Sequence, residues 1–402
     1  MSSPQNQRVL SGMRTTGLLH LGHYEGVLKN WLKLQHEYEC FFFAADWHAL
    51  TTHYENPQVI EDSVWEMIID WLSVGINPSF CKIFIQSRVP QHAELHLLLS
   101  MITPLGWLER VPTYKDQQEK LKELDLATYG FLGYPLLQSA DILLYKAGFV
   151  PVGEDQVVHV EMTREIARRF NHLYGKEPGF EQAAEAAIEK MGKKNAKLYM
   201  NLRKRYQEHG DQEALGMALE LVNNQQNISL GDRERLEGYL HGGGKMILTE
   251  PEVLLTEQCR LPGLDGQKMS KSYHNYIGLR DDTDTVAQKI RKMPTDPARV
   301  RRTDPGEPSK CPVWEFHRVY SDAKTQQWVE EGCRSAGIGC LECKQPIIDV
   351  IEQQLQPIRE NAKQYQENPD VVRNIVNEGC SAARDVAEET MREVREAMRL
   401  DY

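Results

Sequence analysis

Two histidines near the N-terminus could help to bind a phosphate chain. His20 and His23 lie in the run TGLLHLGH, which spans residues 16–23, and a spacing of three places both on one face of a helix starting there. Gly17 and Gly22 in the same run permit a close approach of the backbone to a ligand. Because the first amides of a helix attract anions, the run predicts a triphosphate site.

A second motif, KMSKS at residues 268–272, supplies positive charge. Lys268 and Lys271 flank Ser270 on a short loop. Lysine ammonium groups are point charges that can follow phosphates as charge moves to a leaving pyrophosphate. Either motif alone could be ordinary polar surface, but both in this order, the first after a short strand expected at 8–10, favour a nucleotide-dependent reaction.

An acidic residue in an apolar helix is a candidate for choosing a substrate. Asp141 lies in the run YPLLQSADILLY, with Gln138 three residues and Tyr134 seven residues before it, so that all three can share one helical face. A buried carboxylate is costly without a partner, and an indole N–H is a donor only, which makes Asp141 a suitable acceptor for it. The alternative is an Asp141 that forms an ion pair within the protein.

Four cysteines near the C-terminal end have the spacing C-x21-C-x6-C-x2-C. The close pair Cys340 and Cys343 is typical of a metal or cluster site, and Cys311 and Cys333 complete a set of four. The spacing leaves three interpretations open: a [4Fe–4S] cluster, a four-cysteine zinc site, or four reduced thiols.

A basic stretch directly before these cysteines could bind nucleic acid. The run KIRKMPTDPARVRR at residues 289–302 contains six basic residues in a chain whose formal net charge is −11. Because the chain as a whole is acidic, phosphate contacts need such a local patch. A solvated helix face is the alternative. The six residues are Lys289, Arg291, Lys292, Arg299, Arg301 and Arg302.

Strands and helices alternate in the first half of the chain. The short apolar run at 41–46 is typical of a buried parallel strand, and 82–86 is another strand candidate, with a helical apolar stripe between them. This order predicts an α/β fold, a parallel sheet whose ligands lie at the carboxyl ends of its strands. From about residue 176 to 249 the composition is helical, with a strand-like run only at 246–248, and the region after 280 is mostly helical as well.

Composition sets the broad class of the protein. With 402 residues, 41% hydrophobic and 26% charged, the chain is expected to fold into two or three conventional globular units. No apolar run reaches about 18 residues and no secretory signal is visible, so a cytoplasmic protein without a membrane partner is expected. Its eight cysteines should then stay unpaired.

The motifs together resemble the class I aminoacyl-tRNA synthetases, in particular the tryptophan-specific branch. The resemblance covers SGMRTTGLLHLGH, ADWHALTTHY, YPLLQSADILLY, VPVGEDQVVHVEMTREIARRFN, LPGLDGQKMSKS and the C-terminal region. It implies a Rossmann-like catalytic domain at 1–176, a helical insertion at 177–249, a return with the KMSKS loop at 250–280, and a helical anticodon-binding domain at 281–402 whose last helix packs back on the catalytic domain.

The resemblance also implies what the chain binds. The expected reaction is activation of L-tryptophan by ATP with Mg²⁺, followed by transfer to tRNA(Trp), in a homodimer whose interface includes the apolar stretch 97–111. A subset of the branch carries the same cysteine run and binds a [4Fe–4S] cluster there, with zinc as the alternative. ATP contacts carried over from the family are Arg14, Thr15, Thr16, Gly22, His23, Gly153, Glu154, Asp155, Leu261, Lys268, Met269, Ser270, Lys271 and Ser272.

Two alternatives remain at this point. The spacing of Tyr134, Gln138 and Asp141 is also similar to the tyrosine enzymes, which leaves tyrosine as a second substrate candidate and the job of Gln138 open. The other hypothesis is that the chain is a catalytically silent relative that binds tRNA or nucleotide. Such a protein would not need both nucleotide motifs.

Overall fold

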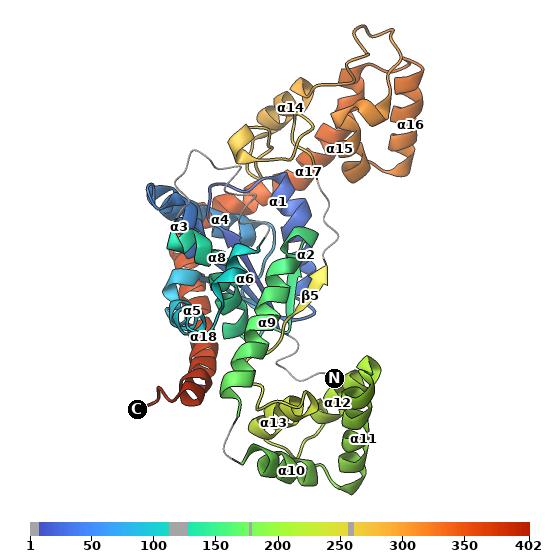
Figure 1. Cartoon of the computed structure of the whole chain (residues 1–402). Helices are drawn as coiled ribbons and strands as arrows, with labels where there is room; N and C mark the ends of the chain where they lie inside the picture. The colour runs from blue at the N-terminus through green and yellow to red at the C-terminus, as the bar shows by residue number, and fades with distance from the viewer. Residues whose placement is uncertain (1–7, 112–127, 177–178, 256–260) are drawn as a thin grey trace.

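A five-stranded parallel sheet forms the centre of the molecule (Figure 1). The structure, a computed structural model, describes residues 8–111, 128–176, 179–255 and 261–402. The strand order is β3-β2-β1-β4-β5, a doubly wound arrangement that confirms the predicted α/β class. The strands are β1 (Arg8–Arg14), β2 (Glu39–Ala45), β3 (Cys81–Ile85), β4 (Phe149–Val152) and β5 (Glu252–Leu255).

The predicted strands exist, with shifted ends. β1 continues to Arg14, because its whole length pairs in parallel with β2. β2 stops before Asp46, which begins the next helix. The strand-like run at 246–248 is not a strand. Its backbone bonds are taken by one side chain, since Asn171 Oδ1 accepts from the amides of Ile247 and Leu248 at 2.9 and 3.0 Å.

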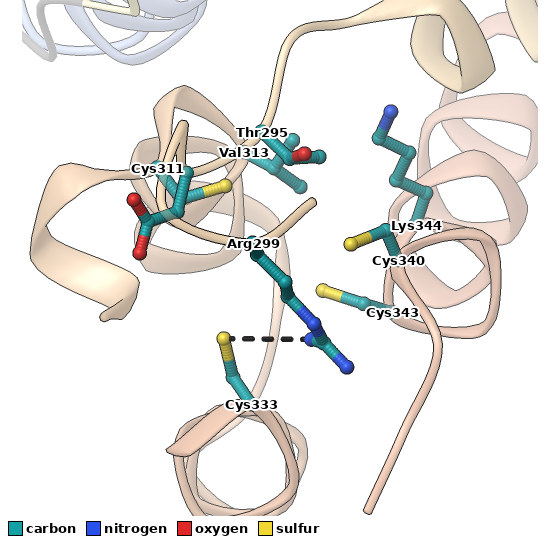
Figure 2. Close-up of a pocket in the computed structure, with 9 residues that line it drawn as sticks. Thr295, Arg299, Cys311, Val313, Cys333, Cys340, Cys343 and Lys344 are labelled. Carbon is teal, nitrogen blue, oxygen red and sulfur yellow. Dashed lines mark hydrogen bonds between the residues drawn. The ribbon is translucent and has the colours of Figure 1, made fainter. Parts of the chain in front are cut away.

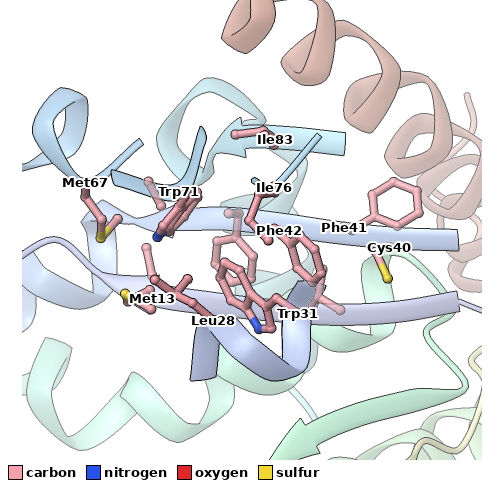
Figure 3. Close-up of a cluster of buried hydrophobic side chains, with 14 of the residues drawn as sticks. Met13, Leu28, Trp31, Cys40, Phe41, Phe42, Met67, Trp71, Ile76 and Ile83 are labelled. Atoms are coloured by element: carbon pink, nitrogen blue, oxygen red, sulfur yellow. The ribbon is translucent and has the colours of Figure 1, made fainter. Parts of the chain in front are cut away.

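Strands β2 and β3 are buried on both faces, as expected for parallel strands. Phe42 in β2 is fully buried and stacks on Trp31, with the ring centroids 4.2 Å apart (Figure 3). Trp71 meets the edge of Trp31 at 5.1 Å. These large rings fix the helices that cover one face of the sheet, and with them the loops that leave the carboxyl ends of the strands.

Helices and short helical turns connect the strands. Up to β4 they are α1 (Leu21–His23), the π-helical turn η2 (Tyr24–Leu28), α2 (Lys29–Leu34), α3 (Asp46–His53), α4 (Gln58–Ser73), η3 (Gln86–Arg88), α5 (Gln91–Ser100), α6 (Leu105–Glu109) and α8 (Tyr129–Leu144). Between β4 and the KMSKS loop they are η4 (Glu154–Gln156), α9 (Val157–Tyr174), α10 (Phe180–Lys190), α11 (Lys193–His209), α12 (Gln212–Asn223) and α13 (Leu230–Leu240). The remainder are η5 (Lys271–Tyr273), α14 (Thr283–Lys292), η6 (Pro308–Lys310), α15 (Pro312–Tyr320), α16 (Ala323–Arg334), α17 (Cys340–Glu367) and α18 (Pro369–Met398).

Helices α10 to α13 form a separate body at one end of the molecule (Figure 1). They enclose an apolar cluster of their own, which includes the fully buried Tyr199. Close backbone packing requires glycine at two positions near the end of this body. A Cβ at Gly244 would lie 2.1 Å from the carbonyl oxygen of Gly175, and one at Gly238 would lie 1.7 Å from that of Gly244. Glycine is therefore required where this body joins α9.

The two last helices return along the sheet (Figure 1). α17 packs against α4, and α18 packs against β3, α5 and α8. The approach of α18 is so close that a Cβ at Gly379 would lie 1.9 Å from the carbonyl oxygen of Ile83. Within the described ranges, no helix has the length and apolar character needed to cross a bilayer.

Candidate active site and cysteine-lined cavity

The two nucleotide motifs meet at the carboxyl edge of the sheet. Leu21 donates its amide to the carbonyl of Ile277 at 3.0 Å, and Leu279 donates to the carbonyl of Leu19 at 3.1 Å. These bonds join the first motif to the segment that follows KMSKS. Residues more than 250 positions apart in the sequence therefore share one local frame.

Lys271 makes the direct connection between the motifs. Its Nζ donates to the carbonyl oxygens of Thr16 and Gly17 at 3.0 and 2.8 Å. Burial lowers the pKa of Lys271 to about 8. The ammonium therefore lies beside the backbone that was predicted to bind phosphates, and its charge is poorly solvated there, which strengthens its attraction to an anion.

His20 and His23 are neighbours, although not in the predicted way. His20 is the N-cap of α1 with extended backbone angles, and only His23 lies within the helix. Their ring centroids are 3.8 Å apart. Burial, and then the charge of Lys271, lowers the pKa of His20 to about 4, and burial lowers the pKa of His23 well below its usual value. Both rings are thus neutral near pH 7 and can donate one N–H each.

Two buried polar atoms at this edge fit a bound nucleotide. Thr15 Oγ1 and His20 Nδ1 have no hydrogen-bond partner within the described residues, and both side chains are at least nine-tenths buried. Buried polar groups in native proteins are normally paired. Phosphate and ribose oxygens would supply the missing partners.

One residue that the sequence analysis missed holds the KMSKS loop. Asn275 is 4% exposed, accepts the amide of Ser270 at 2.8 Å through Oδ1, and donates to the carbonyl of Lys268 at 3.1 Å. A Cβ at Gly263 would lie 2.2 Å from Nδ2 of Asn275. Asn275 therefore fixes the loop from inside, and only its closeness to the motif could have pointed to it.

The other predicted ATP contacts lie around the same edge. Arg14 ends β1 and donates to Thr52 Oγ1, while Met269 is buried beside Gly22. Leu261 is buried as well. After β4, Gly153 is buried, and Glu154 and Asp155 are exposed on η4. Thr16 and Lys268 belong to the two motifs described above, and the side chain of Ser272 lies outside the described part of the chain.

Asp141 lies at the centre of a buried polar cluster. It is 1% exposed and accepts from His48 Nε2 at 2.8 Å, from His92 Nδ1 at 2.6 Å and from Gln86 Nε2 at 2.8 and 3.0 Å. Burial raises the pKa of Asp141, but the charge of His92 and the hydrogen bonds of His48 and His92 outweigh it and lower the pKa to about 2. Asp141 is therefore an ionised acceptor that has partners inside the protein, and its role toward an indole stays a prediction.

Three members of this cluster were not predicted from sequence. His48 lies in α3 directly after β2, Gln86 directly follows β3, and His92 lies in α5. Polar residues at the carboxyl ends of two adjacent strands were the available signal. Tyr134 and Gln138 are both partly buried on α8, and the ring of Tyr134 packs edge-on against His159, with the centroids 5.7 Å apart.

The four cysteines line one cavity of ≈ 20 Å³, about the space of a single water (Figure 2). Cys340 and Cys343 face Cys333 across the Arg299 side chain, whose Nη1 lies 3.8 Å from Cys333 Sγ, and Cys311 lies on the same side of Arg299 as Cys333. Among the described residues, no three His, Cys, Asp or Glu side chains are placed to hold a single metal ion.

Four cysteine thiols are a donor set that either a zinc ion or an iron–sulfur cluster can use. Arg299 and Lys344 also line the cavity, where their positive charges can offset the charge of thiolates. Because the Arg299 side chain extends into the space between the thiols (Figure 2), it would have to withdraw for such a group to bind.

Arg299 does not belong to an exposed basic patch, as the sequence analysis predicted that it would. It is 9% exposed, donates to the carbonyls of Arg302 and Ile338, and faces the cysteines rather than solvent. Lys289 is partly buried in an ion pair with Asp281. The residues of the patch that remain exposed are Arg291, Lys292, Arg301 and Arg302.

Comparison with known proteins agrees with this geometry. A sequence model of the family described as tRNA synthetases class I (W and Y) matches residues 3–201 and 222–356. A tryptophan–tRNA ligase of Ralstonia nicotianae is 69% identical, with 98% of this chain and 99% of the relative covered, and one of Thermotoga maritima is 43% identical, with 98% and 100% covered.

A solved structure has the same fold. Tryptophanyl-tRNA synthetase from Campylobacter jejuni, in complex with ADP and tryptophan, superimposes with a TM-score of 0.73 at 27% identity, covering 98% of this chain and 100% of that one. The motif geometry, the sheet order and these similarities lead to one conclusion: this chain belongs to the class I tRNA synthetases of the tryptophan and tyrosine family.

Proposed function

We propose that the protein is an ATP-dependent tryptophan–tRNA ligase, which forms tryptophanyl-adenylate and pyrophosphate and then esterifies tRNA(Trp). The observation that carries the proposal is the contact of Lys271 Nζ with the Thr16 and Gly17 carbonyls, which joins both nucleotide motifs. The high identity to tryptophan–tRNA ligases supports tryptophan rather than tyrosine as the substrate.

The chemistry needs positioning and charge rather than a general base. The tryptophan carboxylate attacks the α-phosphorus of ATP, the bond to the bridging oxygen breaks, and pyrophosphate leaves. His20 and His23 donate to the phosphates as neutral imidazoles, and Lys268 and Lys271 stabilise the charge that moves to the leaving group. Mg²⁺ bound to the triphosphate would offset further negative charge. A ribose hydroxyl at the 3′ end of the tRNA then attacks the adenylate carbonyl, the bond from this carbon to the phosphate oxygen breaks, and AMP leaves.

The polar cluster around Asp141 is proposed to select tryptophan. Asp141 supplies a fixed negative charge for the indole N–H. Beside it, Gln86 Oε1 is a buried acceptor that has no partner among the described residues. A buried site built for a donor rejects an analogue without one by roughly 10⁴-fold. Tyr134 and Gln138, on the same helix, are proposed to contact the rest of the amino acid.

The cysteine cavity is proposed to hold a [4Fe–4S] cluster through Cys311, Cys333, Cys340 and Cys343, with a structural role beside the anticodon-binding surface. The support is that all four thiols line one cavity together with two cationic side chains. Iron and acid-labile sulfide assays on anaerobically purified protein test the proposal. Stoichiometric zinc without sulfide would favour the zinc alternative instead.

The remaining regions are assigned by their position. We propose that residues 1–176 and 250–280 form the catalytic domain, 177–249 an inserted helical domain, and 281–402 the anticodon-binding domain, with Arg291, Lys292, Arg301 and Arg302 as its phosphate contacts. Because the tRNA substrate is cytoplasmic, we propose the same compartment for the protein.

A second copy of this chain is the proposed partner at the apolar surface of α5 and α6. Leu97, Met101 and Leu105 are 55%, 67% and 57% exposed there, which is unusual for large apolar side chains unless another surface covers them. Size-exclusion chromatography with light scattering measures the molar mass in solution. A monomer mass at micromolar concentration would contradict the proposed dimer.

ATP–pyrophosphate exchange tests the main proposal. Exchange is expected with tryptophan and is expected to be at least a thousandfold weaker with tyrosine or phenylalanine. Equal stimulation by tyrosine would reassign the substrate. Retained ATP and tRNA binding without exchange would favour the catalytically silent relative.

A further inference from the structure

Behind Asp141 lies a second layer of hydrogen bonds that reaches no solvent. His92 and Tyr145 are both 0% exposed. His92 Nδ1 lies 2.6 Å from Asp141 Oδ1, and His92 Nε2 lies 2.8 Å from the hydroxyl of Tyr145. The three side chains form a continuous line from the candidate substrate acceptor into the core.

The Tyr145 hydroxyl matches both charge states of His92. When His92 is neutral, the hydroxyl donates to Nε2, which leaves the ring proton on Nδ1 and directs it at Asp141. When His92 is charged, both ring nitrogens donate, and the same hydroxyl accepts from Nε2. Burial raises the pKa of Tyr145 well above its usual value, so its proton stays in place.

We propose that Tyr145 and His92 are positioning residues for the amino-acid site: Tyr145 fixes the His92 ring through Nε2, and the Nδ1 side of the same ring thereby holds the Asp141 carboxylate aimed at the substrate. The inference deepens the proposed function and rests on it, since Asp141 is the acceptor assigned there to the indole.

The surroundings leave His92 few other options. Its ring packs against Phe43 and Phe84, with centroids 5.9 and 6.1 Å away. The titratable groups near the His92–Tyr145 pair are Asp141 from α8, His48 from α3, His96 from α5 itself and Cys380 from α18. Within the described residues, the ring forms its hydrogen bonds with Asp141 and the Tyr145 hydroxyl.

The informative variant is Tyr145→Phe, which keeps the ring and removes only the hydroxyl. Nε2 of His92 then has no partner to fix the ring, so the ring and the carboxylate that it orients are held less firmly. We therefore expect the KM for tryptophan to rise about tenfold, with kcat changed much less.

Two further variants separate positioning from packing. In the double variant Tyr145→Phe with His92→Asn, the asparagine amide can replace Nδ1–H and needs no partner at Nε2, so the KM for tryptophan should return toward the wild-type value. Tyr199→Phe is the matched control. It also removes a buried hydroxyl bond, to the carbonyl of Leu236, but in the inserted helices, and it should leave KM unchanged.

The KM for tryptophan of each variant, taken as the ratio to wild type, decides the question. A Tyr145→Phe protein with unchanged KM, or a double variant whose KM stays as high as that of Tyr145→Phe alone, would overturn the positioning role while leaving tryptophan-dependent exchange in the wild type intact. Loss of that exchange would instead remove the proposed function itself.

Discussion

The nucleotide site and the cysteine cavity are built in opposite ways. At the carboxyl edge of the sheet, backbone bonds such as Leu21 to Ile277 lock the motifs together, and polar atoms such as Thr15 Oγ1 are left without partners. In the cysteine cavity the four thiols come from loops and helix ends, and an internal side chain, Arg299, fills the centre. The first site is preorganised, with polar atoms left open for a ligand. The second is filled by one of its own side chains, which would have to move for a group to bind.

The largest effect is expected where preorganised charge is removed from the first site. Lys271→Ala should lower the rate of ATP–pyrophosphate exchange about 10²–10³-fold, because the cation that joins the two motifs is lost, while the KM for tryptophan stays within about twofold. Lys194→Ala, on the exposed side of α11, is the control and should behave as wild type. An unchanged exchange rate in Lys271→Ala would remove Lys271 from the transition state.

The buried polar cluster around Asp141 should also affect the stability of the protein in acid. The pKa of Asp141 is about 2 against an ordinary 3.8. Its contribution is therefore present above pH 3.8 and is lost as the pH falls toward 2, with a total of about 2 kcal/mol. Asp141→Asn should lack this part of the acid destabilisation in calorimetric unfolding. Asp370→Asn, a surface carboxylate, should retain it, and equal curves for both variants would contradict the low pKa.

A substitution in the cysteine cavity should remove the bound cluster without affecting amino-acid activation at the sheet edge. Cys343→Ser is expected to lower bound iron and sulfide about tenfold or more, because one of four ligands is gone. Tryptophan-dependent exchange should stay within about twofold, since the cavity lies outside the sheet edge. Cys380→Ala replaces a cysteine that does not line the cavity and should keep its iron. A parallel loss of exchange in Cys343→Ser would show that the two sites are not independent.

The smallest expected effect concerns the surface next to the cavity. Replacing Arg301 and Arg302 together by alanine should weaken tRNA binding a few-fold and lower the salt slope by about 2, one for each phosphate contact. Amino-acid activation should not change. Arg373→Ala, exposed on α18, is the control. A salt slope as steep in the double variant as in the wild type would show that these two side chains are solvated surface and do not contact phosphates.

The parts of the molecule that local pattern controls were predictable. The buried run at 41–46, the helical stripe before 82–86 and the two nucleotide motifs all depend on residue type at short spacing, and the structure places them as an α/β sheet requires. The prediction for 246–248 was wrong because a distant side chain, Asn171, takes the backbone bonds that a strand would use.

Partners contributed by separate elements could not be predicted. The sequence indicated that Asp141 needs a partner, yet nothing near it indicates His48, Gln86 or His92, which arrive from three other segments. The same holds for Arg299. Its basic character predicted a surface contact with phosphate, but in the structure its side chain lies beside Cys333.

Sequence by itself determined which chemistry is available here: imidazole rings, ammonium groups, one costly carboxylate and four thiols, each in a run short enough to have local meaning. Only the tertiary structure decided which of them meet. Hydrogen bonds, burial and the pKa shifts that follow depend on distances through space, and those distances are set when the parallel sheet brings the ends of its strands to a single edge.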